Sequence, residues 1–202
     1  LAKSGVVTHW HRSLPAVPSG PAIILANEFI DALPVHQMIR QGDGWHERVL
    51  TLNAAGDLVF GVSTHPVASF ERVMPKQIRD APAGSIYEWR PDNIAFEIAR
   101  RVRDNGAALI IDYGHSESDI GDTLQAMGKQ AFAGVLSAPG SVDLTAHVDF
   151  AAFGLAAESM GAAMNGPIEQ RDFLLRLGIA ARAEALKAAA RPEKKAEIEA
   201  AL

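Results

Sequence analysis

The sequence lacks cysteine, and it also lacks any long apolar run. None of its 202 residues is cysteine, which excludes disulfides, thiolate metal ligands and a cysteine nucleophile and fits a reducing compartment. No apolar stretch approaches the roughly 18–20 residues that a membrane span requires. The sequence therefore predicts no membrane span.

An excess of positive charge is absent as well. The chain has 24 acidic and 19 basic residues, so its net charge is −5 with the seven histidines counted as neutral. Nothing in this balance argues for a nucleic-acid partner or for an anionic membrane surface, so neither is expected. The composition, 48% hydrophobic and 21% charged, predicts one globular unit with a sizeable core.

The most informative stretch is an apolar run followed directly by polar residues. Residues 22–27 predict a fully buried strand. Asn27, Glu28 and Asp31 then bring an amide and two carboxylates to its carboxyl end, where open α/β sheets bind ligands. A cap with a solvated acid is the alternative, but three polar groups at one strand end favour a functional site.

A second strand of the same kind follows the best-defined helix. Residues 91–105 predict a helix with Pro91 at its first position, and residues 107–113 predict another buried parallel strand. Asp112 and Tyr113 lie at the carboxyl end of that strand. If the two strands are neighbours, we expect Glu28, Asp31 and Asp112 to surround one pocket.

The remaining sequence predicts an insertion and a helical end. Turn-forming residues separate three short β-like runs, which indicates antiparallel hairpins over about residues 35–63. Two further strands are expected at residues 6–10 and 162–169. Asp149 is a good N-cap for a predicted helix over residues 150–160. The carboxyl-terminal part, about residues 170–202, predicts helices.

Three segments resemble the MidA-like S-adenosylmethionine-dependent methyltransferases. Residues 27–37 read Asn-Glu-Phe-Ile-Asp-Ala-Leu-Pro-Val-His-Gln. Residues 109–115 read Leu-Ile-Ile-Asp-Tyr-Gly-His, and residues 139–150 read Pro-Gly-Ser-Val-Asp-Leu-Thr-Ala-His-Val-Asp-Phe. They come in the family's order, and the resemblance extends from about residue 7 to residue 182. Mitochondrial members of that family are complex I assembly factors that methylate a protein arginine.

The resemblance implies a fold, a cofactor and a partner. The expected fold is α/β, a doubly wound Rossmann-like methyltransferase sheet with an antiparallel β insertion. The family's amino-terminal half carries a glycine-rich cofactor loop that we do not find here, so residues 1–202 are expected to be a partial methyltransferase domain, an internal fragment without the first strands. The implied cofactor is S-adenosylmethionine. The implied acceptor is a protein arginine, on a respiratory complex I subunit, in the mitochondrial matrix of a eukaryote or the cytoplasm of a bacterium.

The acceptor side of the expected site contains two acids and a histidine. Glu28 and Asp31 have the chemistry to bind a guanidinium through paired hydrogen bonds, and a single helical turn would place both on one side. The alternative for Asp31 is a cap. His147 is a candidate proton acceptor, because an unperturbed histidine titrates near neutrality. An ordinary structural histidine is the equal alternative.

The cofactor side of the expected site contains Asn27, Asp112 and Tyr113. Asn27 has an amide suited to the cofactor's amino-acid end or to the acceptor nitrogen. Tyr113 is either a wall for the cofactor's base or a core residue.

Other chemistries have weaker support. Asp112, His115, His147 and Asp149 are possible metal ligands, but no helix carries the His-x-x-x-His spacing of a zinc hydrolase. The Gly-x-Ser-x-Gly turn of a serine hydrolase is also absent. The rival from another class is a non-catalytic, protein-binding assembly factor on a methyltransferase fold.

Overall fold

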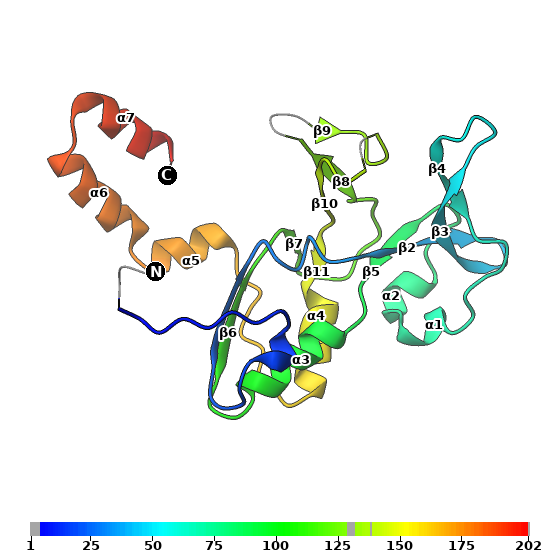
Figure 1. Cartoon of the computed structure of the whole chain (residues 1–202), viewed down its shortest axis with the longest axis horizontal. Coiled ribbons are helices and arrows are strands. Elements are labelled where there is room, and N and C mark those ends of the chain that lie inside the picture. Colours follow the sequence, from blue (N-terminus) through cyan, green and yellow to red (C-terminus); the bar gives the residue numbers. More distant parts are fainter. Residues whose placement is uncertain (1–4, 129–131, 138, 202) are drawn as a thin grey trace. The chain divides into compact units, whose positions relative to one another are not determined.

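The computed structural model describes residues 5–128, 132–137 and 139–201 of the chain (Figure 1). These form two compact units, Leu1–Met164 and Asn165–Leu202. Across the described ranges, none of the helices has the length and apolar character needed to cross a membrane.

The first unit contains a pair of parallel strands with a helix between them in sequence. Strand β1 (Ile23–Asn27) pairs in parallel with β6 (Ala107–Ile111) over all five residues. Helix α3 (Asn93–Val102) begins two residues later than expected. Its N-cap is Asp92, so Pro91 lies before the helix and not at its first position. The predicted adjacency of the two strands is confirmed.

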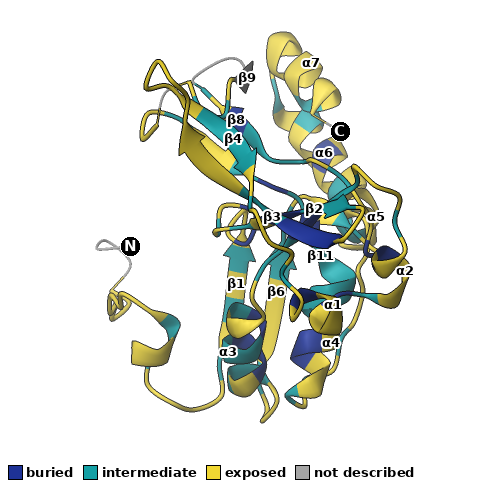
Figure 2. Cartoon of the chain, turned by 90° about the vertical axis from the view of Figure 1, so that its right-hand side faces the viewer, coloured by how far each residue is buried: buried dark blue, intermediate teal, exposed yellow. Residues whose placement is uncertain are grey.

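Strand β1 is not fully buried, and this part of the prediction is wrong. Ile23 is 90% exposed and Leu25 is 68% exposed, while Ile24 and Ala26, which alternate with them, are half-buried. Figure 2 shows β1 in the colours of exposed and intermediate residues. Successive side chains of a strand point to opposite faces. One face of β1 is therefore left open by the described residues.

The expected β insertion forms a four-stranded antiparallel sheet in the order β4-β3-β2-β5. The strands are β2 (His36–Gln41), β3 (Gly44–Leu52), β4 (Leu58–Val62) and β5 (Ile86–Trp89). Two short helices, α1 (Phe70–Val73) and α2 (Lys76–Arg79), lie between β4 and β5 in sequence. They contribute to one apolar cluster, made of Met38, Trp45, Phe70, Met74, Ile78 and Tyr87.

A second parallel pair includes the strand that follows β6 in sequence. Strand β7 (Gly114–His115) pairs in parallel with β11 (Val148–Asp149), and helix α4 (Phe150–Ser159) follows at once. The Asp149 carboxylate accepts a hydrogen bond from the Ala152 N–H at 2.9 Å. This confirms the predicted N-cap, which satisfies a backbone donor that the helix leaves free.

The other elements are short. A small antiparallel sheet has the order β10-β8-β9, formed by β8 (Gln125–Met127), β9 (Phe132–Ala133) and β10 (Asp143–Thr145). A single 3-10 turn, η1 (Leu14–Ala16), precedes β1. The second unit contains the predicted helices, α5 (Gln170–Arg176), α6 (Ile179–Ala189) and α7 (Pro192–Ala200), and residue 202 lies outside the described residues.

Two strand predictions are wrong. Residues 6–10 and 162–169 form no strand. A β-like sequence becomes a strand only when a neighbour takes its backbone hydrogen bonds. No described segment pairs with either stretch.

Candidate active site

The carboxylate of Asp112 joins the ends of the two paired strands. Its Oδ2 accepts hydrogen bonds from three consecutive backbone N–H groups, those of Phe29 at 3.2 Å, Ile30 at 2.8 Å and Asp31 at 3.3 Å. Its Oδ1 accepts from the Tyr113 N–H at 2.9 Å. Successive N–H groups that converge in this way form a nest for an anion. Asp112, directly after β6, therefore holds in place the turn that follows β1.

The turn after β1 is not helical, contrary to expectation. Glu28 has a φ of 46°, in the left-handed region, and its N–H donates to the Ile111 carbonyl at 2.9 Å. Glu28 is exposed, whereas Asp31 is only 6% exposed. The two acids do not share one side of a helical turn, because the N–H groups between them bind Asp112 instead.

Asp31 is the most unusual acid of the site. Its Oδ1 is buried and has no hydrogen-bond partner among the described residues. Burial raises the pKa of this carboxyl above its ordinary value, and the nearby charge of Asp112 raises it further. A buried acceptor without a donor is uncommon in folded proteins. Asp31 therefore fits a position at which a bound group supplies a donor.

The segment that contains His147 is attached to the same turn. The Ala146 N–H donates to the Asp31 carbonyl at 3.1 Å, and the His147 N–H donates to Thr123 Oγ1 at 2.8 Å. The ring of His147 lies 6.5 Å from that of His115, centroid to centroid. Both rings line a hollow together with Glu88, Asp119 and Thr123.

The structure thus brings most of the expected residues to one edge. Asn27, Glu28, Asp31, Asp112 and Tyr113 all lie at the carboxyl ends of the paired strands. Tyr113 is 61% exposed, so the core alternative for it is wrong. The two best-defined hollows among the described residues, however, are lined by other residues, and Glu28, Asp31 and Asp112 are not among them.

Two further residues contribute to this region, and one of them, Arg90, was not expected from the sequence. His115, weighed above as a possible metal ligand, ends the second of the three motifs and has a buried Nε2 atom without a partner among the described residues. Arg90 donates four hydrogen bonds to backbone carbonyls around the site. Nothing in the local sequence marks Arg90, since it follows a short strand that carries no motif.

A metal site finds no support in the part of the chain that the structure describes. No group of three or more His, Asp or Glu side chains there is arranged to hold a metal ion. Two of the possible ligands, Asp112 and Asp149, use their carboxylates for backbone hydrogen bonds.

Parallel strands joined through a helix define an α/β protein, and proteins of this class generally bind ligands at the carboxyl ends of such strands. The chain belongs to the family described as "Putative S-adenosyl-L-methionine-dependent methyltransferase", whose family model matches residues 1–168. The resemblance noted in the sequence is thereby confirmed, and the fold is of the α/β methyltransferase class.

Mitochondrial proteins named protein arginine methyltransferase NDUFAF7 are among the relatives. Identity is 38% with the homologue from Drosophila melanogaster, over 94% of this chain and 45% of the relative. It is 34% with the Homo sapiens protein, over 92% of this chain and 42% of the relative. The chain therefore spans somewhat less than half the length of these relatives.

Solved structures also support the methyltransferase fold. The crystal structure of a likely methyltransferase from Burkholderia thailandensis, with S-adenosyl-homocysteine bound, matches this chain with a TM-score of 0.75 at 29% identity. The match covers 88% of this chain and 47% of that one.

Proposed function

We propose that the protein transfers a methyl group from S-adenosylmethionine to an arginine of a protein acceptor. One observation carries this proposal. In a chain of this methyltransferase family, Glu28, Asp31 and Asp112 lie together at the carboxyl ends of the β1–β6 pair, which we call the acidic edge. The mitochondrial relatives are named protein arginine methyltransferases, and this name suggests the arginine acceptor. The chain covers less than half of those relatives, so the activity is proposed for the complete protein.

The residues at this edge fit the cofactor and its acceptor. S-adenosylmethionine is cationic at sulfur and at its amino group, and it offers N–H and O–H donors. Hydrogen-bond acceptors for these donors are present at Asn27, at Glu28 and at the Asp31 Oδ1 atom, which has no partner among the described residues. We assign Asn27 and Tyr113 to the cofactor. Asp112, whose carboxylate is engaged by four backbone N–H groups, acts on the cofactor side by holding the turn.

Methyl transfer to arginine requires orientation and a proton acceptor. When bound, S-adenosylmethionine supplies the electrophilic methyl group. A guanidinium remains protonated to a pH above ~12, so it must be held and its charge localised before one nitrogen can react. Glu28 and Asp31 orient the guanidinium through charge-assisted hydrogen bonds. His147 accepts the proton that the nitrogen loses.

The cellular context follows from the relatives. Those quoted above are mitochondrial proteins. We therefore propose the mitochondrial matrix for a eukaryotic source and the cytoplasm for a bacterial one. A respiratory complex I subunit is the proposed acceptor, as the family resemblance implies.

A protein-binding role without catalysis is the second candidate, and one surface favours it. Strands β3 and β4 carry an exposed apolar ladder on one face, formed by Leu50, Leu52, Leu58 and Val62. Apolar residues grouped in this way commonly mark a protein interface. An assembly factor would use this ladder and show no turnover.

The test is methyl incorporation by the complete protein. Labelled S-adenosylmethionine and complex I subunits are incubated with wild type, with Glu28→Gln and with the matched control Glu71→Gln, whose side chain is exposed on α1. We expect methylarginine with wild type and the control, and at least about a tenfold loss with Glu28→Gln. Binding of a subunit without any methylation would support the assembly factor instead.

A further inference from the structure

Arg90 follows β5 and binds two separate segments of the site. Its Nη2 donates to the Asp31 carbonyl at 2.9 Å and to the Ala146 carbonyl at 2.8 Å, while its Nη1 donates to the His147 carbonyl at 2.8 Å. Its Nε donates to the Leu33 carbonyl at 3.3 Å. One side chain therefore bridges the turn after β1 and the segment before β11.

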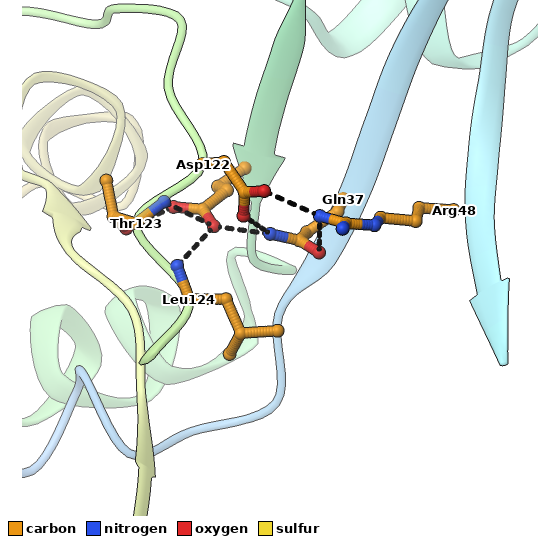
Figure 3. Close-up of polar contacts among 6 residues, drawn as sticks. Gln37, Arg48, Asp122, Thr123 and Leu124 are labelled. Atoms are coloured by element: carbon orange, nitrogen blue, oxygen red, sulfur yellow. Dashed lines mark hydrogen bonds and ion pairs between the residues drawn. The ribbon is translucent and has the colours of Figure 1, made fainter. Parts of the chain in front are cut away.

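Glu88, two residues before Arg90, also binds the segments around the site. This buried carboxylate accepts hydrogen bonds from Gln37 Nε2 at 2.7 Å, from the Leu124 N–H at 3.0 Å and from both the N–H and the hydroxyl of Thr123. Figure 3 shows Thr123 and Leu124 on one side of this network, and Gln37, Asp122 and Arg48 on the other. The Thr123 oxygen in turn accepts the His147 N–H.

The backbone of His147 is thus held on both sides by charges from the β5 segment. Arg90 binds its carbonyl directly, and Glu88 binds its N–H through Thr123. The antiparallel sheet is connected to the expected proton acceptor by a short chain of hydrogen bonds. Asp31 is on the same connection, because its carbonyl accepts from both Arg90 and the Ala146 N–H.

Burying the charged guanidinium of Arg90 at this position costs free energy of folding. Its partners are neutral carbonyls, so burial lowers the pKa of Arg90, although the charges of Glu88, Asp112 and Asp31 partly offset this effect. A well-packed apolar side chain is often the more stable choice at such a position. What only arginine supplies is a rigid, planar fork with five donors, which fixes several acceptors at once. Arg90 therefore fixes the relative positions of these carbonyls at a cost in folding stability.

We propose that Arg90 is a positioning residue that sets the distance and orientation between His147 and the turn bearing Asp31. This inference rests on the proposed function, because it assigns Arg90 to the geometry of that same site. Arg90 touches neither acceptor nor cofactor in the proposal. It acts through the backbone of the two segments that it joins.

The experiment compares Arg90→Lys with the matched control Arg103→Lys in the complete protein. Arg103 is a partly exposed arginine at the end of α3. Lysine keeps the charge but not the planar fork, and a displacement of about 1 Å in a site can lower turnover about 100-fold. We expect Arg90→Lys to lower kcat about 10- to 100-fold with the cofactor Kd nearly unchanged, and Arg103→Lys to behave as wild type. Millimolar guanidinium added to Arg90→Ala should restore part of the turnover.

Two results would overturn the proposal. One is unchanged kcat in Arg90→Lys. The other is a loss of kcat in which cofactor affinity and melting temperature fall together and guanidinium restores nothing, as a purely structural arginine would give.

A readout without turnover separates this inference from the proposed function. Amide hydrogen exchange of peptides covering residues 31–33 and 146–147 should accelerate at both places in Arg90→Lys. If wild type methylates no acceptor, the proposed function fails, and the exchange data alone decide on Arg90. Unchanged exchange at both places would then reject the positioning role.

Discussion

At the scale of single residues, the Asp112 and Asp31 carboxylates of the site differ in their hydrogen bonding. The Asp112 carboxylate is engaged by four backbone N–H groups, while the Asp31 carboxyl lies buried with one oxygen free of partners among the described residues. Similar acids near each other in space therefore differ in what they can still bind. The Oδ1 atom of Asp31 has no partner among the described residues, so it can still accept a hydrogen bond from a ligand.

Replacing Asp31 tests this capacity. In the complete protein, Asp31→Asn removes one charge-assisted hydrogen bond to the acceptor, worth roughly 1.5–3 kcal/mol. We expect about a 10- to 100-fold lower kcat/KM for methyl incorporation, with cofactor affinity nearly unchanged. Asparagine is itself a good cap, so unchanged turnover would show that Asp31 only caps the turn. Lost cofactor binding would move it to the cofactor side.

The same variant should change how stability depends on pH. The pKa of Asp31 is raised above its ordinary 3.8, chiefly by burial. The folded state therefore holds this proton more tightly than the unfolded state, so its ionisation costs stability as pH rises from about 3.8 through the raised pKa. Asp31→Asn lacks this ionisation. We expect the free energy of unfolding of the variant, relative to wild type, to increase over that range and then level off.

Urea unfolding at a series of pH values measures this difference. A difference between variant and wild type that stays constant over the whole range would mean that the Asp31 carboxyl ionises as easily in the folded protein as in the unfolded chain.

At the scale of elements, the close approach of β7 and β11 requires a glycine. A Cβ on Gly114 would lie 2.1 Å from the Val148 carbonyl oxygen and 2.9 Å from the Phe150 ring. This pair places His115 and Asp149 beside each other in register. No side chain can therefore be added at residue 114 without separating the strands that support the site.

Gly114→Ala should consequently destabilise the protein. Overpacking typically costs about 1–3 kcal/mol, and the clash here is with backbone, which cannot rotate away. The matched control is Gly42→Ala, since a Cβ at Gly42 meets nothing within 4 Å. We expect a lower melting temperature for Gly114→Ala and a change within about 0.5 kcal/mol for the control. Equal stability of the two variants would contradict the close approach.

At the scale of the whole molecule, we propose that the chain carries only part of the cofactor site. Its 202 residues span less than half of the mitochondrial relatives. No glycine-rich turn follows a buried strand in the sequence, and one face of β1 is open. Glycine-rich turns and the helix after them supply the N–H groups that many nucleotide-like cofactors need.

We therefore expect residues 1–202 alone to bind S-adenosylmethionine weakly. The affinity should be at least roughly 100-fold below that of the complete protein, about 2.8 kcal/mol. Calorimetric titration of the 202-residue chain measures it, with the complete protein as the reference. Low-micromolar affinity of the short chain would show that the acidic edge binds the cofactor without further help.

The sequence by itself determined the elements that depend on local patterns. The apolar runs before Asn27 and Asp112 predicted two parallel strands, and turn residues predicted the hairpins between residues 35 and 63. Asp149 was identified as a cap from its position alone. Such features are set within a few residues, so one stretch of sequence contains the information that decides them.

The tertiary structure decided everything that depends on a distant partner. Residues 6–10 look like a strand but pair with no described segment, and Ile23 is exposed because the described chain covers only one face of β1. Asp112 reaches three N–H groups more than 80 residues away, which makes the turn after Glu28 non-helical. Arg90 binds carbonyls 56 to 59 positions distant. No local pattern records these contacts, because hydrogen-bond partners and burial are fixed only when separate elements meet.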